Sequence, residues 1–182
     1  MASIHKPFKI IVLGDLGTGK TGVIQHLIFG NHIIQSKDVP YTIEDIYKAD
    51  INIGKGVWYR VCLFDTSGKS LYDDQLLEHY ISIAEGIVLT YNITEKPTFD
   101  TVIQLRKKIS ERHKDIPIII LGTHSDYEDS RQVDKLSTIH WAEMQKLSAF
   151  EVTLTSRETL REPFVSLVTN IAISKGLPVT KK

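Results

Sequence analysis

The sequence has little cysteine, no excess charge of either sign and no long apolar run. Its 182 residues include one cysteine, Cys62, so disulfides cannot hold the fold and a reducing compartment is expected. Lysine plus arginine and aspartate plus glutamate number 22 each. This balance offers no electrostatic surface for nucleic acid. No apolar run reaches the length that crosses a bilayer. Together these absences argue against a secreted disulfide-rich domain, a nucleic-acid-binding domain and a membrane-spanning protein.

Signals for lipid anchors and transition metals are also missing. The chain begins MASI, without the glycine that myristoylation requires, and ends VTKK, without a cysteine for prenylation. Stable anchoring takes two signals, so we expect no stable membrane anchor and a cytoplasmic protein. The seven histidines lack metal-site spacing, which predicts no transition-metal site.

Short apolar runs alternate with segments of helical spacing along the chain. This alternation predicts one α/β domain over residues 1–182, with a core of about 6–175 and an open, mostly parallel sheet covered on both faces. The last helix is expected to hold Pro163 in its first turn. Strands are expected at 8–14, 46–53, 57–64, 86–93, 116–122 and 150–155, and helices from Lys20 to Gly30, around 99–109, over 136–147 and around 160–171.

The segment Gly14–Thr21 carries the strongest functional signal. It reads GDLGTGKT and fits the pattern GxxxxGK[ST] between an expected strand and an expected helix. In such a loop, glycines let consecutive N–H groups turn toward a phosphate at a helix N-terminus. Lys20 would reach the outer phosphates, and the Thr21 hydroxyl would ligate Mg²⁺. A glycine-rich turn that binds nothing is the alternative. The residues expected at the phosphates are Gly14, Leu16, Gly17, Thr18, Gly19, Lys20, Thr21 and Gly22.

Three later loops, taken with the first, resemble those of the Ras family of small GTPases. PYTIEDIY at 40–47 resembles the first switch, in which Thr42 matches the threonine that closes on Mg²⁺ and the γ-phosphate. DTSG resembles the second switch, where Asp65 would hold Mg²⁺ through water and the Gly68 N–H would meet the γ-phosphate. GTHSD at 122–126 stands at the guanine loop. The resemblance implies a P-loop NTPase G domain: a mostly parallel six-stranded sheet with one antiparallel edge strand, binding GTP or GDP with Mg²⁺.

A narrower resemblance is to the κB-Ras proteins, Ras-like proteins that interact with NF-κB inhibitors. It rests on the stretches FGNHII, EDIYKADI and FEVTLTSRETLREPFVSL and on the missing lipid site. It implies two partners that bind the switch regions: an NF-κB inhibitor of the IκB class and the GTPase-activating complex that acts on Ral. The alternative for Ile43 and Tyr47 is packing on neighbouring helices. The expected contact residues are Tyr41, Ile43, Glu44, Asp45, Tyr47, Leu71 and Tyr72.

Two positions depart from the usual Ras pattern where hydrolysis is catalysed. Leu16 stands where most Ras proteins carry a second glycine, and its side chain would block an incoming arginine finger. Lys69, next to Gly68, replaces the glutamine that orients the attacking water. Slow or absent hydrolysis is therefore expected. The alternative is that Lys69 stabilises charge on the γ-phosphate and assists the reaction.

The expected base pocket is altered as well. Asp126 is kept, and its oxygens can accept from the guanine N1–H and 2-amino group. Thr123 replaces the bracing asparagine, His124 replaces the lysine whose stem packs along the base, and His32 matches the aromatic at the base edge. A guanine-selective pocket is expected, and loose specificity is the alternative. The residues that stand in place of the family's Ser-Ala-Lys are Leu154, Thr155 and Ser156.

Together these features predict a κB-Ras-type protein that holds GTP or GDP with Mg²⁺ and acts as a regulatory binding subunit. An ordinary cycling Ras-family GTPase, with its own exchange factor and activator, is the main alternative. A P-loop small-molecule kinase is a weaker one, because the sequence shows no arginine-bearing lid insert.

Overall fold

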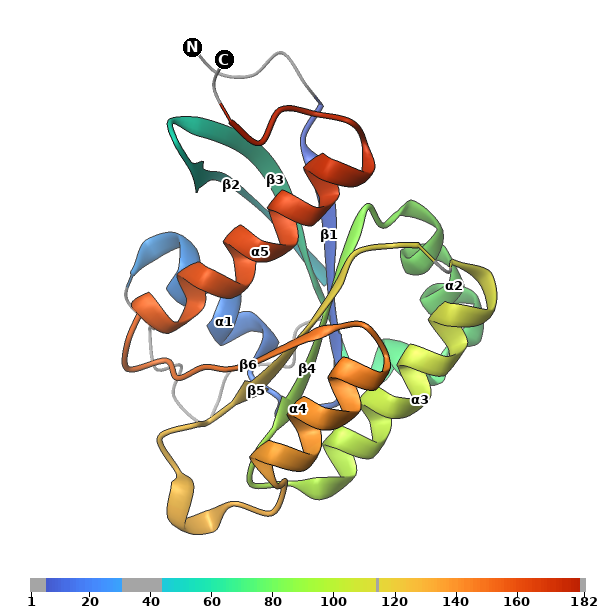
Figure 1. The fold of residues 1–182 in the computed structure, drawn as a ribbon. Coiled ribbons are helices and arrows are strands. Elements are labelled where there is room, and N and C mark those ends of the chain that lie inside the picture. Colours follow the sequence, from blue (N-terminus) through green and yellow to red (C-terminus); the bar gives the residue numbers. More distant parts are fainter. Residues whose placement is uncertain (1–5, 31–43, 114, 181–182) are drawn as a thin grey trace.

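A six-stranded sheet forms the centre of the molecule (Figure 1), in the order β2-β3-β1-β4-β5-β6. The computed structural model describes residues 6–30, 44–113 and 115–180. Only β2 runs antiparallel to its neighbour, and it lies at one edge of the sheet. This topology confirms the predicted mostly parallel sheet with one antiparallel edge strand. The strands are β1 (Phe8–Gly14), β2 (Glu44–Gly54), β3 (Val57–Thr66), β4 (Gly86–Asn92), β5 (Ile118–Thr123) and β6 (Ser148–Glu151).

Helices cover both faces of the sheet. In Figure 1, α1 and α5 lie on one face, and α2, α3 and α4 lie on the other. No helix in the described ranges combines the length and apolarity needed to cross a membrane. The helices are α1 (Lys20–Phe29), α2 (Asp74–Ile83), α3 (Lys96–Arg112), α4 (Lys135–Met144) and α5 (Glu158–Ser174), with short 3₁₀ helices η1 (Gly68–Tyr72) and η2 (Glu128–Ser130).

The burial of strand β1 explains why its sequence, FKIIVLG, is apolar except for the exposed Lys9. Ile10 and Val12 pack toward α1 and α5, whereas Ile11 and Leu13 pack toward α2 and α3. All four side chains are fully buried, because successive residues of a strand point to opposite faces and both faces are covered.

Local sequence signals set several boundaries as expected. Gly30 adopts the left-handed conformation directly after α1, and its N–H donates to the His26 carbonyl, as in a helix C-cap. The turn between β2 and β3 includes Lys55 and Gly56, both with positive φ. The predicted hairpin at this point is confirmed.

Two local expectations were wrong, and one helix was missed. The last strand was placed at 150–155, but β6 ends at Glu151, because the next residues turn toward the loop after β5. Pro163 is the sixth residue of α5, so it lies beyond the first turn. The helix α2 was not anticipated, although Asp73 caps it by accepting from the N–H groups of Gln75 and Leu76.

Candidate functional site

The predicted phosphate loop, second switch and base loop each follow the carboxyl end of a parallel strand. Gly14 ends β1, Thr66 ends β3 and Thr123 ends β5, and this edge is where open α/β sheets bind ligands. A cavity of about 140 Å³ opens there between the phosphate loop and the second switch. Its lining residues are Leu16, Gly17, Gly19, Lys20, Thr21, Thr66, Ser67 and Gly68. Most of the residues predicted at the phosphates are thus brought together.

The backbone of the phosphate loop requires glycine at two positions. Gly17 has φ of 76° and Gly19 has φ of 75°, in the left-handed region that side chains disfavour. Gly19 directly precedes α1, so the loop leads into a helix N-terminus whose first N–H groups have no intrahelical partner. This arrangement of backbone dipoles suits a phosphate group.

Lys20 is held beneath the loop as a buried cation. Its Nζ donates to the carbonyl oxygens of Gly14 and Asp15, each at 2.8 Å, and the residue is 7% exposed. Burial lowers the pKa of Lys20 to about 8, although the carboxylates of Asp65 and Asp15 act in the opposite direction. An anionic phosphate would complete the charge balance of this ammonium group.

Thr21 and Asp65 form an oxygen site next to Lys20. The Thr21 hydroxyl donates to Oδ2 of Asp65 at 2.6 Å. The other oxygen, Oδ1, is buried and accepts no hydrogen bond within the described ranges. Burial raises the pKa of Asp65, an effect reduced by the bond from Thr21 and the charge of Lys20. A carboxylate oxygen without a hydrogen bond, beside a hydroxyl, fits Mg²⁺. This ion prefers oxygen ligands and is usually bound by one or two carboxylates together with phosphate oxygens.

The second switch packs directly onto the phosphate loop. Gly68 is buried, and a Cβ atom built on it would lie 2.5 Å from the Leu16 backbone nitrogen, so only glycine fits. The side chains of Leu16 and Lys69 are both exposed, Leu16 at 36%. Of the two residues that depart from the Ras pattern, Leu16 lines the cavity, and Lys69 directly follows Gly68, which also lines it.

Thr123 joins the base loop to the phosphate loop. Its Oγ1 lies 3.1 Å from the Thr18 carbonyl oxygen and 3.0 Å from that of Tyr91, both of which can accept its proton. Because a hydroxyl has one proton, the 2.9 Å contact with Nδ1 of His124 is satisfied when that nitrogen carries the proton. The bracing role expected of an asparagine is thus filled by a threonine.

His124, in the base loop, lies close to the phosphate loop. It adopts φ of 61°, and a Cβ atom built on Gly19 would lie 3.7 Å from its Cε1. Burial lowers the pKa of His124, which favours the neutral ring. A neutral ring at this point can provide an apolar surface for a base, as the lysine stem does in the Ras pattern.

Asp126 is oriented by a residue that the sequence analysis missed. The Thr153 hydroxyl donates to Oδ1 of Asp126 at 2.9 Å, and the Thr155 N–H donates to the Thr153 Oγ1. Thr153 directly precedes the predicted segment 154–156. Within that segment, Leu154 packs against the core beneath α5, and Ser156 accepts from Thr159 through its carbonyl. The family's Ser-Ala-Lys begins with a hydroxyl-bearing residue. Matching that hydroxyl to Thr153 would have placed the segment one residue earlier, at 153–155.

Asp15 is a second residue that the sequence analysis missed. Its carboxylate accepts from the Leu16 N–H at 2.7 Å and, at longer distances of 3.3 to 3.4 Å, from the hydroxyls of Thr101 and Tyr72. Its charge raises the pKa of Tyr72. Asp15 therefore links the phosphate loop to η1 and α3. In the sequence, the signal for this role was an acidic residue among the glycines of the phosphate loop.

The expected partner surface is only partly exposed. Leu71 was predicted to contact a partner, but it is 7% exposed and packs in the core beneath α2. Tyr47 is half-buried and accepts from Gln25. Tyr72 is 74% exposed, and Ile46, which was not predicted, is 48% exposed. Other predicted residues lie outside the described ranges: His32, Tyr41, Thr42 and Ile43.

Comparison with known proteins agrees with this geometry. The model of the Ras family matches residues 9–173. The NF-kappa-B inhibitor-interacting Ras-like protein 1 of Homo sapiens is 37% identical over 169 residues, covering 92% of this chain and 87% of the relative. The NF-kappa-B inhibitor-interacting Ras-like protein 2 of Gallus gallus is 36% identical over 183 residues, covering 97% of this chain and 94% of the relative. The corresponding protein 1 of Danio rerio is 35% identical over 168 residues.

Proposed function

Because the chain belongs to the Ras family and is related to the NF-κB inhibitor-interacting Ras-like proteins, we propose that it binds GTP or GDP with Mg²⁺ at the carboxyl edge of its sheet. The observation that carries the proposal is the convergence there of the buried Lys20, the Thr21–Asp65 pair and the Asp126–Thr153 pair. These groups supply a cation for phosphate, oxygens for a metal ion and a carboxylate for a base.

Each part of the site has a distinct task in this proposal. Lys20 and the backbone N–H groups of the loop hold the phosphates, and Asp126 accepts from the base with its orientation set by Thr153. Thr21 and Asp65, the latter through water, would hold Mg²⁺ together with Thr42, which lies outside the described ranges. When bound, Mg²⁺ neutralises phosphate charge and polarises the phosphoryl group.

Hydrolysis is slow or absent in this proposal. The ammonium of Lys69 has no acceptor with which to orient a water molecule, unlike a glutamine side chain. Leu16 adds a branched side chain where an activating arginine would enter. The protein then works as a regulatory binding subunit rather than a timed switch.

The proposed partners are an NF-κB inhibitor of the IκB class and the GTPase-activating complex that acts on Ral. The relatives' names describe interaction with NF-κB inhibitors, and the exposed Tyr72 and Ile46 offer apolar anchors beside the acids Glu44 and Asp45. The protein is proposed to act in the cytoplasm. The surface is tested by measuring how purified partners bind the double variant Tyr72→Ala with Ile46→Asp. The control is Lys107→Ala, on the exposed face of α3.

The nucleotide proposal is tested by identifying what the purified protein carries. Chromatography of the denatured protein should release GDP or GTP from wild type and from Lys107→Ala, and none from Lys20→Ala. Asp126→Asn should shift preference from guanine to xanthine nucleotides, because an amide can donate where xanthine offers a carbonyl. A wild type without nucleotide, whose melting temperature does not change with GTP and Mg²⁺, would refute the proposal.

A further inference from the structure

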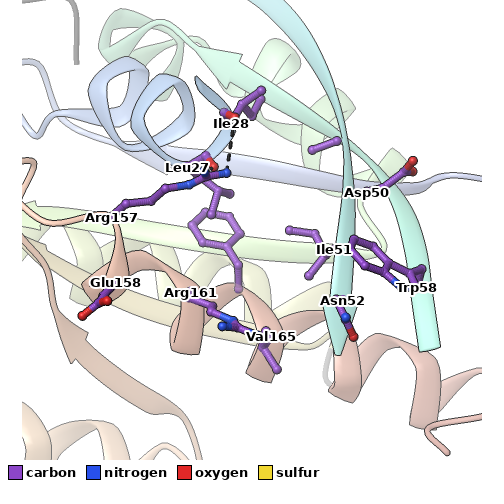
Figure 2. A pocket seen from close by; sticks show the side chains of 12 residues that line it. Leu27, Ile28, Asp50, Ile51, Asn52, Trp58, Arg157, Glu158, Arg161 and Val165 are labelled. Atoms are coloured by element: carbon purple, nitrogen blue, oxygen red, sulfur yellow. Dashed lines mark hydrogen bonds between the residues drawn. The ribbon is translucent and has the colours of Figure 1, made fainter. Parts of the chain in front are cut away.

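A hollow of about 530 Å³ lies away from the phosphate loop, between β2, α1 and α5 (Figure 2), and two arginines line it. Figure 2 shows Arg157, which directly precedes α5, extending toward the end of α1. Its Nε donates to the Leu27 carbonyl at 3.0 Å, and its Nη2 donates to the Ile28 carbonyl at 3.4 Å. Arg161, four residues further along, has no hydrogen bond or ion pair within the part of the chain that the structure describes. The two arginines therefore differ in what they hold.

Arg157 is fitted to the C-terminal end of α1. The carbonyls of Leu27 and Ile28 belong to the last turn of this helix, which ends at Phe29. The last four carbonyls of a helix have no N–H partner within it, so a guanidinium group there supplies donors and opposes the partial negative charge of the helix end. Gly30 lets the side chain lie close, because a Cβ atom built on it would be 3.4 Å from Nη1 of Arg157.

Arg157 also directly follows the segment that meets the base loop. The Thr153 N–H donates to Oγ1 of Thr159 at 3.3 Å, and the same hydroxyl lies 2.8 Å from the Ser156 carbonyl. These bonds fold the segment onto the first turn of α5. From this segment, the Thr153 hydroxyl reaches Oδ1 of Asp126. A shift of the segment would therefore move the hydroxyl that orients Asp126.

The helix α1 connects the two halves of the nucleotide site. Lys20 and Thr21, the residues proposed at the phosphates and at Mg²⁺, begin this helix, and Arg157 binds its other end. Ten residues of helix are about 15 Å long and are held rigid by their own hydrogen bonds. Arg157 therefore fixes the base-orienting segment relative to the helix that carries the phosphate-binding residues.

From these contacts we propose that Arg157 is a positioning residue for guanine recognition. By binding the end of α1, it keeps the Thr153 hydroxyl where it can orient Asp126 toward the guanine N1–H and 2-amino group. Arg157 acts through these two residues and not on the base itself. This role rests on the proposed function, because it concerns the base of the nucleotide bound at the carboxyl edge of the sheet.

The ratio of the affinities for GDP and inosine diphosphate tests the proposal. Hypoxanthine lacks the 2-amino group of guanine, so the ratio reports the hydrogen bond from that group to Asp126. Arg157→Ala should lower the ratio by about three- to tenfold, the loss typical of one hydrogen bond. Arg157→Lys, which can keep one of the two bonds to α1, should lower it less. Arg161→Ala, on the same helix, is the matched control and should keep the wild-type ratio.

The ratio also separates positioning from simple capping of α1. Both nucleotides bind only folded protein, so the ratio does not depend on how much of a variant is folded. If Arg157 acts through Thr153, adding Arg157→Ala to Thr153→Val should change the ratio no further.

Three results would overturn the proposal. One is that Arg157→Ala lowers both affinities equally, as loss of a helix cap alone would. Another is that the effects of Arg157→Ala and Thr153→Val on the ratio multiply. The third is that wild type binds the two nucleotides equally. A wild type that binds neither nucleotide would instead refute the proposed function itself.

Discussion

The hydroxyl of Thr153 lies 2.9 Å from Oδ1 of Asp126, a residue 27 positions earlier in the chain. The bond fixes one oxygen of an exposed carboxylate that would otherwise rotate freely in water. It comes from the segment after β6, so the sheet order β5-β6 is what brings the two residues together.

Removing this hydroxyl should weaken base binding without unfolding the protein. Thr153→Val is expected to lower the affinity for GDP by about tenfold, the usual effect of losing a hydrogen bond to a charged group. Displacement of a fluorescent GDP measures the change. Thr153→Ser restores the hydroxyl and should return the affinity close to wild type. Equal affinities for the valine and serine variants would show that Asp126 needs no support.

The bridge from Thr123 should matter for both stability and nucleotide retention. Thr123→Val keeps the shape of the side chain but removes the one proton that the carbonyls of Thr18 and Tyr91 can accept. We expect a loss of about 1–3 kcal/mol in the free energy of unfolding and faster release of nucleotide. Chemical denaturation and stopped-flow release measure the two effects. Thr123→Ser is the control, and an unchanged release rate in the valine variant would contradict the bridge.

Nucleotide affinity should fall as the pH rises through about 8. Burial lowers the pKa of Lys20 to about 8, so the free protein loses this proton above that pH, whereas bound phosphate favours the charged form. Protonation and binding are therefore coupled, and affinity is greatest below the midpoint. Titrations between about pH 7 and 9 should show the decline in wild type. Lys20→Arg, whose charge does not titrate in this range, should give a flat profile.

The same depressed pKa has a consequence for the free protein. Below about pH 8, Lys20 is charged in both states, but its charge is buried in the folded state and hydrated in the unfolded state. This burial lowers the free energy of unfolding below pH 8, and the loss is recovered as the pH rises toward 10.5. Nucleotide-free protein should therefore gain stability in this window, and Lys20→Met should not. Thermal melts across the window give the comparison.

Hydrolysis should respond to Leu16 and Lys69 together. Leu16 lines the cavity at the phosphate loop, Lys69 follows Gly68 in the second switch, and Gly68 packs against the backbone of Leu16. Leu16→Gly with Lys69→Gln should raise single-turnover GTP hydrolysis more than the product of the two single effects, because both changes act on one transition state. Lys107→Ala serves as the surface control. A wild type as fast as ordinary Ras proteins would contradict the assignment.

Much of the fold and the phosphate loop could be predicted from the sequence. The run FKIIVLG, the motif GDLGTGKT and Gly30 each determine their own conformation through burial, positive φ or helix capping, and these are short-range effects. The alternation of such segments predicts a parallel sheet, and a parallel sheet places all its carboxyl-end loops at one edge. The sequence alone therefore predicted that Lys20, Thr21, Asp65 and Asp126 lie at one edge of the sheet.

Only the tertiary structure decided which side chains complete that site and which surfaces remain open. Leu71 lies in a loop by its sequence, yet the packing of η1 beneath α2 buries it. Thr153 reaches Asp126, and Arg161 and Trp58 line one hollow between β2, α1 and α5, because β6 and α5 pack against segments far away in the chain. Such contacts depend on how helices and strands pack across one another and on which polar groups are left without a partner. Short-range sequence patterns carry no information about these two properties.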